Sequence, residues 1–237
     1  MPHLFRTVPS KNRYYSWFEA LHTRVDLLLL APLSESAFTE IEEKVHRCLL
    51  SVEKMGNRFD PDSELSQAVE KATMKPVKLS TSLYALLVRC REARIQTGGL
   101  FDITVNSPDY YPGMVKEVEL TPEGCLRLHR ADIILDLSGI LKGYALEQVR
   151  TLLHALNIND AIVNLGNSSI LALGNVPTDI PSGHCLTTSG NATVQRRHIR
   201  NPLTGTYIEG RGTISVITND AIDGEVQSIV SFIRQKH

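Results

Sequence analysis

Apolar residues recur every three or four positions along two long stretches of the chain, and this spacing predicts two amphipathic helices. The first is expected over residues 34–57. The second is expected from Ser80 or Thr81 to the pair Gly98-Gly99, since glycine favours a helix end. Between them, Asp62 or Ser63 is placed to cap a short helix, because both side chains accept hydrogen bonds from backbone N–H groups.

The second half of the chain has a different texture, with short apolar runs bounded by glycine, proline and polar residues. Such runs predict strands, here at residues 24–31, 133–137, 161–165, 170–173 and 213–217. Helical spacing returns over residues 139–156 and 221–234. Because helices and strands do not alternate regularly, we expect an α+β fold, with residues 1–237 forming one large domain of a mixed sheet and packed helices.

The composition adds little beyond exclusions. With 237 residues, 42% of them hydrophobic, the chain is able to bury a substantial core. A net charge of −1 provides no basic field for a phosphate backbone, so we do not expect nucleic-acid binding. The four cysteines are widely separated, which argues against a zinc ribbon or a disulfide scaffold and predicts reduced thiols.

No stretch of the chain looks suited to cross or enter a membrane. The apolar run Leu27 to Ala31 is far too short to span a bilayer. The first seventeen residues contain no uninterrupted apolar segment of the kind found in signal peptides. We therefore expect a soluble protein on the cytoplasmic side.

The segment DLSGILKGYA, residues 136–145, has the composition of an anion cradle. A carboxylate, Asp136, ends an apolar run, a Ser-Gly pair opens a helix, and Lys142 and Gly143 follow within its first turn. Backbone N–H groups at a helix start, together with a lysine, suit a phosphate. An ordinary strand-to-helix turn uses the same residue types, so this interpretation depends on other segments.

Four further segments place polar or small residues at predicted junctions. TGGLFDITV carries Asp102 at the start of an apolar strand, where an uncompensated carboxylate is costly, although a helix cap or surface position is the alternative. VNLGN and TTSGN put small residues where a ligand or another backbone comes close, or where a simple turn occurs. RHIRNPLTG carries His198, and a lone histidine is more often structural than catalytic.

Taken in order, these segments resemble the FAD:protein FMN transferase family, the ApbE-type bacterial flavin transferases once called thiamine-biosynthesis lipoproteins. The resemblance covers almost the whole chain. It rests on NRFDPDSELS, TGGLFDITV, DLSGILKGYAL, VNLGN, TTSGN and HIRNPLTG, which follow one another as in the family.

The resemblance implies binding of FAD and Mg²⁺, and transfer of the FMN half of FAD to a Thr or Ser hydroxyl of a partner flavoprotein, with release of AMP. It implies two catalytic residues, Lys142 as a fixed positive charge near the phosphates and His198 as a phosphate contact or an aid to deprotonating the acceptor. The implied metal ligands are Gly139, Asp223 and Ser228. The implied flavin-nucleotide contacts are Leu21, Phe59, Leu100, Phe101, Asp102, Asp136, Lys142, Gly143, Thr188, Ser189, Gly190 and His198.

Several positions depart from the family pattern, and the C-terminal ones bear on the metal. The family's metal-binding Asp and Thr correspond to Gly224 and Ser228, so the site lacks its carboxylate unless Asp223 or Glu225 replaces it. Two other functions therefore remain open beside the transferase. One is an FAD pyrophosphatase, in which water replaces the acceptor hydroxyl, and the other is a non-catalytic flavin-nucleotide binder that has lost its metal site.

Overall fold

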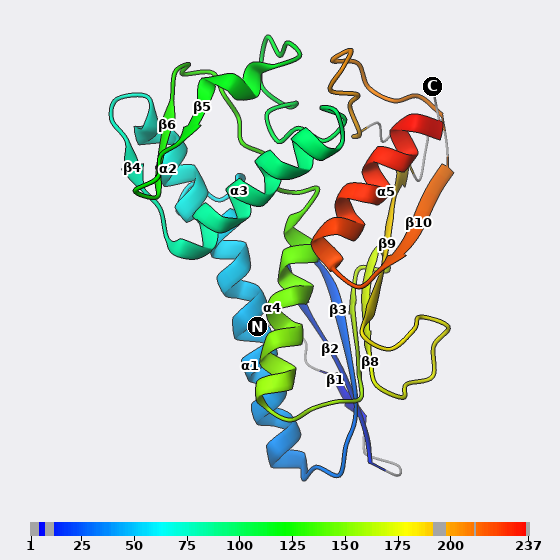
Figure 1. The fold of residues 1–237 in the computed structure, drawn as a ribbon. Helices are drawn as coiled ribbons and strands as arrows, with labels where there is room; N and C mark the ends of the chain where they lie inside the picture. Colours follow the sequence, from blue (N-terminus) through cyan, green and yellow to red (C-terminus); the bar gives the residue numbers. More distant parts are fainter. Residues whose placement is uncertain (1–4, 8–11, 192–197, 211, 236–237) are drawn as a thin grey trace. The chain divides into compact units, whose positions relative to one another are not determined.

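A computed structural model describes residues 5–7, 12–191, 198–210 and 212–235 and has an α+β fold, as predicted. The helices are α1 (Glu35–Gly56), α2 (Glu64–Ala72), α3 (Thr81–Gln96), α4 (Leu141–Ala155), α5 (Ala221–Gln235) and the 3-10 helix η1 (Met114–Glu117). The strands are β1 (Phe5–Thr7), β2 (Arg13–Ala20), β3 (Thr23–Leu30), β4 (Val77–Lys78), β5 (Val118–Leu120), β6 (Cys125–Leu128), β7 (Ala161–Leu165), β8 (Ser169–Leu173), β9 (His184–Asn191) and β10 (Gly212–Thr218). Figure 1 shows their arrangement.

The strands form two sheets, one of seven strands in the order β1-β2-β3-β7-β8-β9-β10 and one of three in the order β4-β6-β5. From β1 to β9 the neighbouring strands of the large sheet are antiparallel, so the parallel component of the expected mixed sheet is not found among these pairs.

One predicted strand is wrong, because residues 133–137 form an extended loop. Its backbone N–H groups bond to another loop instead of a neighbouring strand: that of Asp136 donates to the Ile103 carbonyl at 2.8 Å, and that of Ile134 donates to the Ser107 hydroxyl at 2.9 Å. Asp102 likewise lies in a turn and not at a strand start. TTSGN, in contrast, belongs to a strand, β9, and not to a turn.

The chain divides into two compact units. Unit 1 consists of Met1–Glu53, Ile140–Thr188 and Ser215–Glu225, and unit 2 of Lys54–Gly139, Ser189–Ile214 and Val226–His237. The expectation of one domain over residues 1–237 therefore stays a prediction, and each unit is described by itself.

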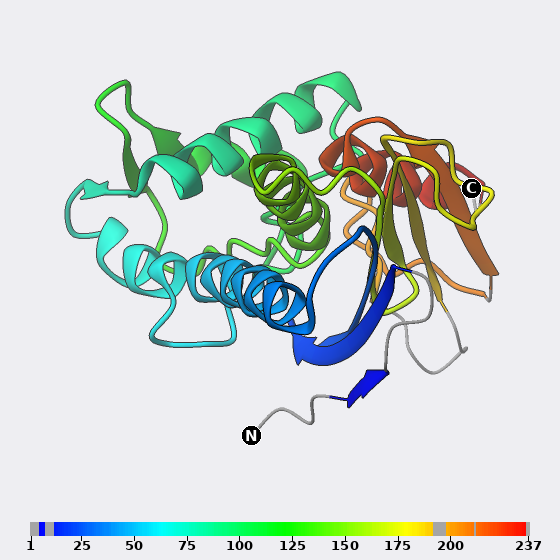
Figure 2. The ribbon, with the colours of Figure 1, turned by 90° about the horizontal axis from the view of Figure 1, so that it is seen from below.

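In unit 1, strand register places the buried side chains on one face of the large sheet. Phe18 pairs with Val25, Val25 with Leu165, and Leu165 with Ser169, and all four are buried. Directly paired residues of antiparallel strands point to the same face. This face is covered by α1 and α4, which lie side by side in Figures 1 and 2.

Aromatic contacts fix α1 on β2 in unit 1. The Tyr14 and Phe38 rings stack with centroids 5.1 Å apart, and the Phe18 and His46 rings lie 4.8 Å apart. Contacts of this kind add to the stabilisation that burial itself provides.

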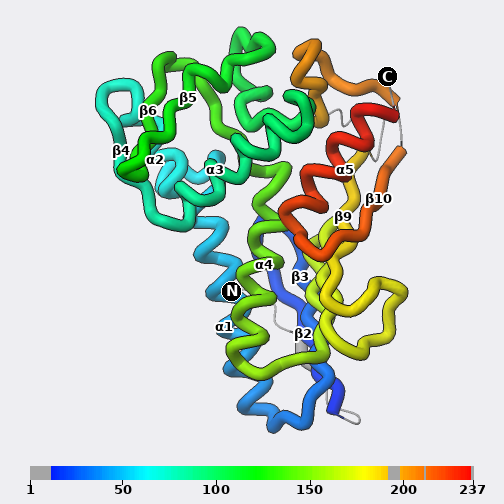
Figure 3. Tube along the Cα trace, viewed as in Figure 1, coloured from blue at the N-terminus to red at the C-terminus, as the bar shows by residue number. Residues whose placement is uncertain are grey.

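Unit 2 contains α2, α3 and the small sheet, which packs on α2 (Figure 3). The predicted cap of α2 is confirmed at Ser63, which accepts from Ser66 N–H at 3.1 Å. Ser80, where the second long helix was expected to begin, caps α3 by accepting from Leu83 N–H at 3.2 Å. Glu64 links the two helix starts, because its carboxylate accepts from both the N–H and the hydroxyl of Ser80.

The structure also bears on two features considered in the sequence, membrane-spanning segments and the state of the cysteines. Among the described residues, no helix is both long and apolar enough to cross a bilayer. All four cysteines are free thiols, with Cys90 and Cys185 buried and Cys48 and Cys125 half-buried.

Candidate functional site

Asp102 is a buried carboxylate held on both oxygens. Its Oδ1 accepts the N–H of Thr104 at 2.8 Å and the Thr104 hydroxyl at 2.6 Å, and its Oδ2 lies 3.0 Å from Arg94 Nε. Arg94 comes from the last turn of α3. Sequence analysis identified no partner for the negative charge of Asp102. In the structure, Arg94 at the end of α3 neutralises this charge.

Tyr110 connects the Asp102 turn to the HIRNPLTG segment. Its hydroxyl donates to the Pro202 carbonyl at 2.9 Å and lies 3.5 Å from Asp102 Oδ2. Burial, and then the negative charge of Asp102, raise the pKa of Tyr110, so the phenol keeps its proton. Arg200 makes a second connection, because its Nη1 donates to the Val105 carbonyl at 2.6 Å.

Asp136 is a second buried carboxylate, and it joins two motifs. Arg58 of NRFDPDSELS places Nε 2.8 Å from its Oδ2, and Asn106, which follows TGGLFDITV, donates to the same oxygen at 2.8 Å. The N–H of Ser138 donates to Oδ1 at 2.9 Å. Burial alone raises the pKa of Asp136, but the hydrogen bonds from Ser138 and Asn106 and the charge of Arg58 outweigh it, so the pKa is held below its ordinary value.

Three of the four apolar residues implied in flavin binding, Phe59, Leu100 and Phe101, belong to unit 2 and differ in exposure. Phe59 is 67% exposed, and the Arg58 guanidinium lies 3.9 Å from its ring centroid. Phe101 is buried, and Leu100 packs partly buried against the cluster of Ile199, Ile208, Phe232 and Ile233. Of the two phenylalanines, Phe59 therefore presents the more open aromatic surface.

In unit 1, Lys142 lies in the first turn of α4 and contacts the Ser168 hydroxyl. The cap residue Ile140 supplies no side-chain hydrogen bond to this helix start. First-turn N–H groups have no partner within their own helix. The helix start expected from DLSGILKGYA is confirmed, and such N–H groups beside a lysine are of the kind that suits an anion; binding of a phosphate there stays a prediction.

Glu225 is a buried carboxylate close to Lys142. It accepts a hydrogen bond of 2.5 Å from the Ser169 hydroxyl. Burial raises the pKa of Glu225 above its ordinary value, and the Lys142 charge and the Ser169 hydrogen bond offset only part of that shift. Unit 1 thus combines a lysine with a buried acid whose pKa lies above that of an ordinary glutamate.

Gly143 is explained by helix packing within unit 1. A Cβ atom at Gly143 would lie 2.4 Å from the Ala221 carbonyl oxygen and 2.8 Å from Glu225 Cγ. Only glycine lets α4 approach the first turn of α5 this closely. Its role toward a nucleotide stays a prediction.

The residues of TTSGN make contacts to strand β10 or to α5. Thr188 Oγ1 lies 2.7 Å from Ser215 Oγ in unit 1, and Ser189 Oγ lies 2.7 Å from Ser228 Oγ in unit 2. A Cβ at Gly190 would lie 2.2 Å from the Gly212 carbonyl oxygen. The close backbone approach expected for this motif is confirmed, and the approaching backbone is a strand of the same chain.

Two of the residues implied as metal ligands, Asp223 and Ser228, do not form a set that fits Mg²⁺, which is usually held by one or two carboxylates together with water and phosphate oxygens. Asp223 is exposed, while the buried Ser228 hydroxyl is engaged by Ser189. At Gly224, a Cβ would lie 2.6 Å from Thr218 Oγ1 and 2.7 Å from Thr187 Oγ1. Among the described residues, no group of three or more His, Cys, Asp or Glu side chains is placed to hold a metal ion.

Two of the implied site residues, His198 and Leu21, lie at an exposed position and in a hairpin turn, respectively. His198 is exposed at the start of a described segment. Leu21, with φ 54°, and His22, with φ 55°, form the turn between β2 and β3, and Leu21 N–H donates to Glu53 at 2.8 Å. These φ values are typical of a two-residue type I′ hairpin turn.

Unit 2 therefore joins the segments of Asp102, Asp136 and Pro202 by direct hydrogen bonds, while Lys142 belongs to unit 1. That Asp102, Asp136, Lys142, Ser189 and His198 line one cleft stays a prediction. Sequence reasoning missed the polar partners Arg58, Arg94, Asn106, Tyr110 and the Glu225 contact. Arg58 could have been considered, because it belongs to the motif NRFDPDSELS. Nothing in the sequence around Arg94, an arginine on a helix, indicates that it pairs with a buried carboxylate.

The fold is of the α+β class, and comparison with known proteins defines the class of protein further. The ApbE family model matches residues 21–109 and 111–237, so the chain belongs to the ApbE family. A comparison with curated protein sequences finds no significant match.

Solved structures show the same fold at low sequence identity. The flavin transferase ApbE from Vibrio cholerae is 18% identical, with 97% of this chain and 86% of that chain covered and a TM-score of 0.76. The Pseudomonas stutzeri flavinyl transferase ApbE is 16% identical over 94% and 86%, with a TM-score of 0.79. The ApbE protein from Thermotoga maritima is 17% identical over 100% and 88%, with a TM-score of 0.76.

Proposed function

We propose that this protein binds FAD and transfers its FMN half to a Thr or Ser hydroxyl of a partner flavoprotein, releasing AMP. The observation that carries the proposal is the uncapped start of α4, with Lys142 in its first turn, in a chain that matches the ApbE family over nearly its whole length. This helix start is suited to the FAD pyrophosphate.

In the proposed reaction, the acceptor oxygen forms a bond to the phosphorus of the FMN half. The bond from that phosphorus to the bridging oxygen breaks, and the bridging oxygen leaves with AMP. Reactions of this kind depend mostly on positioning and charge neutralisation. Lys142 supplies a fixed positive charge, worth about 4 kcal/mol at about 4 Å and an effective dielectric constant near 20.

His198 is proposed to accept the proton of the acceptor hydroxyl or to contact the phosphate, and its exposure supports access from solvent. Asp102 and Asp136 are proposed to contact the flavin nucleotide. Their arginine and backbone partners support this role, because a carboxylate held on both oxygens keeps its orientation when a ligand binds.

The family's use of Mg²⁺ is not carried over as a step, because Gly224, Ser228 and Asp223 do not supply a fitting ligand set. This mismatch favours a second candidate, a flavin-nucleotide binder without catalysis. Both candidates use the same α4 start, and they differ in whether the pyrophosphate is cleaved.

The test is incubation of the full chain with FAD and a flavoprotein that carries a candidate acceptor hydroxyl, with and without Mg²⁺, followed by mass spectrometry. A covalent FMN adduct on the acceptor together with AMP supports the transferase. Free FMN with AMP indicates a pyrophosphatase. FAD binding with neither product indicates the non-catalytic binder, and absence of FAD binding overturns all three.

A further inference from the structure

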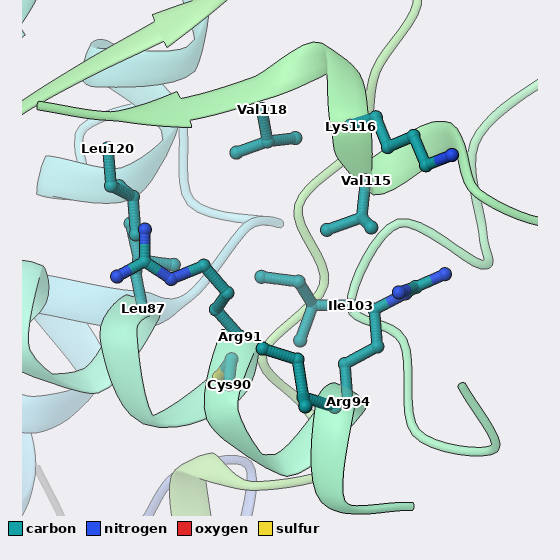
Figure 4. A pocket seen from close by; sticks show the side chains of 10 residues that line it. Leu87, Cys90, Arg91, Arg94, Ile103, Val115, Lys116, Val118 and Leu120 are labelled. Carbon is teal, nitrogen blue, oxygen red and sulfur yellow. The ribbon is translucent and has the colours of Figure 1, made fainter. Parts of the chain in front are cut away.

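Unit 2 contains a cavity of about 250 Å³ between α3 and the η1–β5 segment, whose lining includes none of the residues proposed to bind the flavin nucleotide (Figure 4). Its walls are mostly aliphatic: Leu87 and Ile103 are buried, and Val115, Val118 and Leu120 are half-buried. The volume suits a small ligand, because an apolar protein cavity of about 150 Å³ binds benzene.

The rim of the cavity is positively charged. Figure 4 shows the guanidinium of Arg91 on one side and the charged ends of Arg94 and Lys116 on the other. Arg94 pairs with Asp102, but within the described part of the chain the side chains of Arg91 and Lys116 form no hydrogen bond or ion pair. Cationic groups beside an apolar cavity, with no acid to neutralise them, favour an anionic ligand head.

The thiol in the wall does not change this chemistry. Burial raises the pKa of Cys90 to about 12, so the thiol remains neutral and adds apolar surface. No carboxylate of the described residues lines the cavity.

We propose that this cavity, the α3–β5 pocket, binds a small apolar molecule with a single carboxylate, such as a medium-chain or aryl-alkyl carboxylic acid. The apolar body lies against Leu87, Ile103 and Leu120, and the carboxylate pairs with Arg91 or Lys116 at the rim.

Two residues that line the pocket also contact the buried Asp102 and Asp136 segments of unit 2, so a bound ligand can affect both carboxylates. Arg94 lines the pocket and places Nε 3.0 Å from Asp102 Oδ2. Ile103 also lines the pocket, and its carbonyl accepts the Asp136 N–H at 2.8 Å. A bound carboxylate that attracts Arg94, or a chain that displaces Ile103, therefore shifts the turn that carries Asp102.

The experiment uses the full chain without FAD, so its outcome is independent of the proposed function. Binding of octanoate is measured by calorimetry beside 1-octanol, a probe of matched length without charge. We expect one octanoate per chain and an affinity at least about tenfold higher than that of 1-octanol, as for hydrogen bonds to charged groups. Equal affinities, or no octanoate binding, would overturn the proposal.

Variants locate the site. Arg91→Gln combined with Lys116→Gln should remove most of the advantage of octanoate, whereas Arg127→Gln, an exposed arginine on β6, should leave it unchanged. Leu120→Trp should abolish binding of both probes by filling the cavity, and Val118→Phe provides a second filling variant if the first fails to fold. Binding that survives in a folded filling variant contradicts the site.

The coupling to the carboxylates has its own readout. In amide NMR spectra, octanoate should shift resonances of residues 102–106 and 136–138 in addition to those of the pocket. These shifts should be lost in the Arg91/Lys116 double variant and kept in Arg127→Gln. Shifts confined to the pocket residues would contradict the coupling.

Discussion

Arg94 and Asp102 form an ion pair with Nε 3.0 Å from Oδ2, and it ties the last turn of α3 to the turn that follows. The Asp102 side chain is 1% exposed and that of Arg94 26% exposed, so water screens the pair poorly. The carboxylate also receives two hydrogen bonds from Thr104, which orient it independently of the arginine. The pair therefore neutralises a charge that Thr104 has already positioned.

Replacing the arginine should destabilise the protein strongly. Arg94→Met keeps most of the apolar stem but leaves the Asp102 carboxylate buried without its cation, and we expect a loss of about 3 kcal/mol in the free energy of unfolding. Urea unfolding of the variant beside Arg127→Met, which changes an exposed arginine, measures the loss. If the two variants lose the same small amount, the pair does not hold the turn.

The contribution of Glu225 to the free energy of unfolding should change with pH in the opposite direction from that of a salt-bridged acid. The folded pKa of Glu225 is raised, chiefly by burial, so the folded state binds more protons than the unfolded state above the ordinary glutamate value of about 4.3. Stability should therefore fall as pH rises from that value through the folded pKa. Glu225→Gln should flatten this decline, while Glu92→Gln, an exposed control on α3, should not. Unfolding free energies of the three proteins, measured from about pH 4 to about pH 8, test this dependence on pH. Parallel profiles for the three proteins would contradict its assignment to Glu225.

Long periodic segments of this fold could be predicted from sequence, and segments whose partners are distant could not. Helix α1 was expected at residues 34–57 and runs from Glu35 to Gly56, because its apolar face repeats over many turns. Strand β2 was missed because its buried face, Tyr14, Ser16, Phe18 and Ala20, includes a serine and an alanine that interrupt the apolar alternation. A sequence pattern identifies a buried strand face by its hydrophobic residues, so a buried serine such as Ser16 makes that face hard to recognise.

The candidate site shows the same division. Asp102, Asp136 and Lys142 could be singled out because glycine-rich or helix-start motifs surround them. Their partners could not, because Arg58 reaches Asp136 and Glu225 reaches Lys142 only through the tertiary fold. Gly143 shows a further limit, since the same small residue that suits a ligand also suits the close approach of Ala221.

Lys142 and His198 should have separable effects if the protein uses FAD as proposed. A charge that contacts the phosphates in both ground and transition states contributes to binding and to rate. Lys142→Met should therefore weaken FAD binding by about tenfold to a hundredfold, the range for hydrogen bonds to charged groups, and slow any cleavage as well. His198→Ala should act mostly on the rate. Calorimetry with FAD and single-turnover product analysis separate the two effects, and negligible change in both variants would mean that the site is misplaced.

The final prediction concerns the position where the family resemblance places a metal-binding aspartate. Sequence alone suggests that Gly224→Asp restores the carboxylate and raises Mg²⁺ affinity, provided that the glycine needs no positive φ. The backbone there is helical, but a Cβ would lie 2.6 Å from Thr218 Oγ1 and 2.7 Å from Thr187 Oγ1. We therefore expect Gly224→Asp to lower the free energy of unfolding by about 1–3 kcal/mol, as overpacking does, before any metal is bound.

A double-mutant cycle separates the steric cost from the metal. Thr187 Oγ1 is buried and, among the described residues, has no hydrogen-bond partner, so Thr187→Ala removes one clash at small polar cost. In that background the penalty of Gly224→Asp should shrink, and Mg²⁺ titration should show tighter binding than in wild type if the new carboxylate reaches the ion. Urea unfolding and calorimetry on the four proteins measure both quantities. If Gly224→Asp alone is as stable as wild type, the packing at Gly224 does not explain the missing aspartate, and a simple loss of the metal-binding residue does.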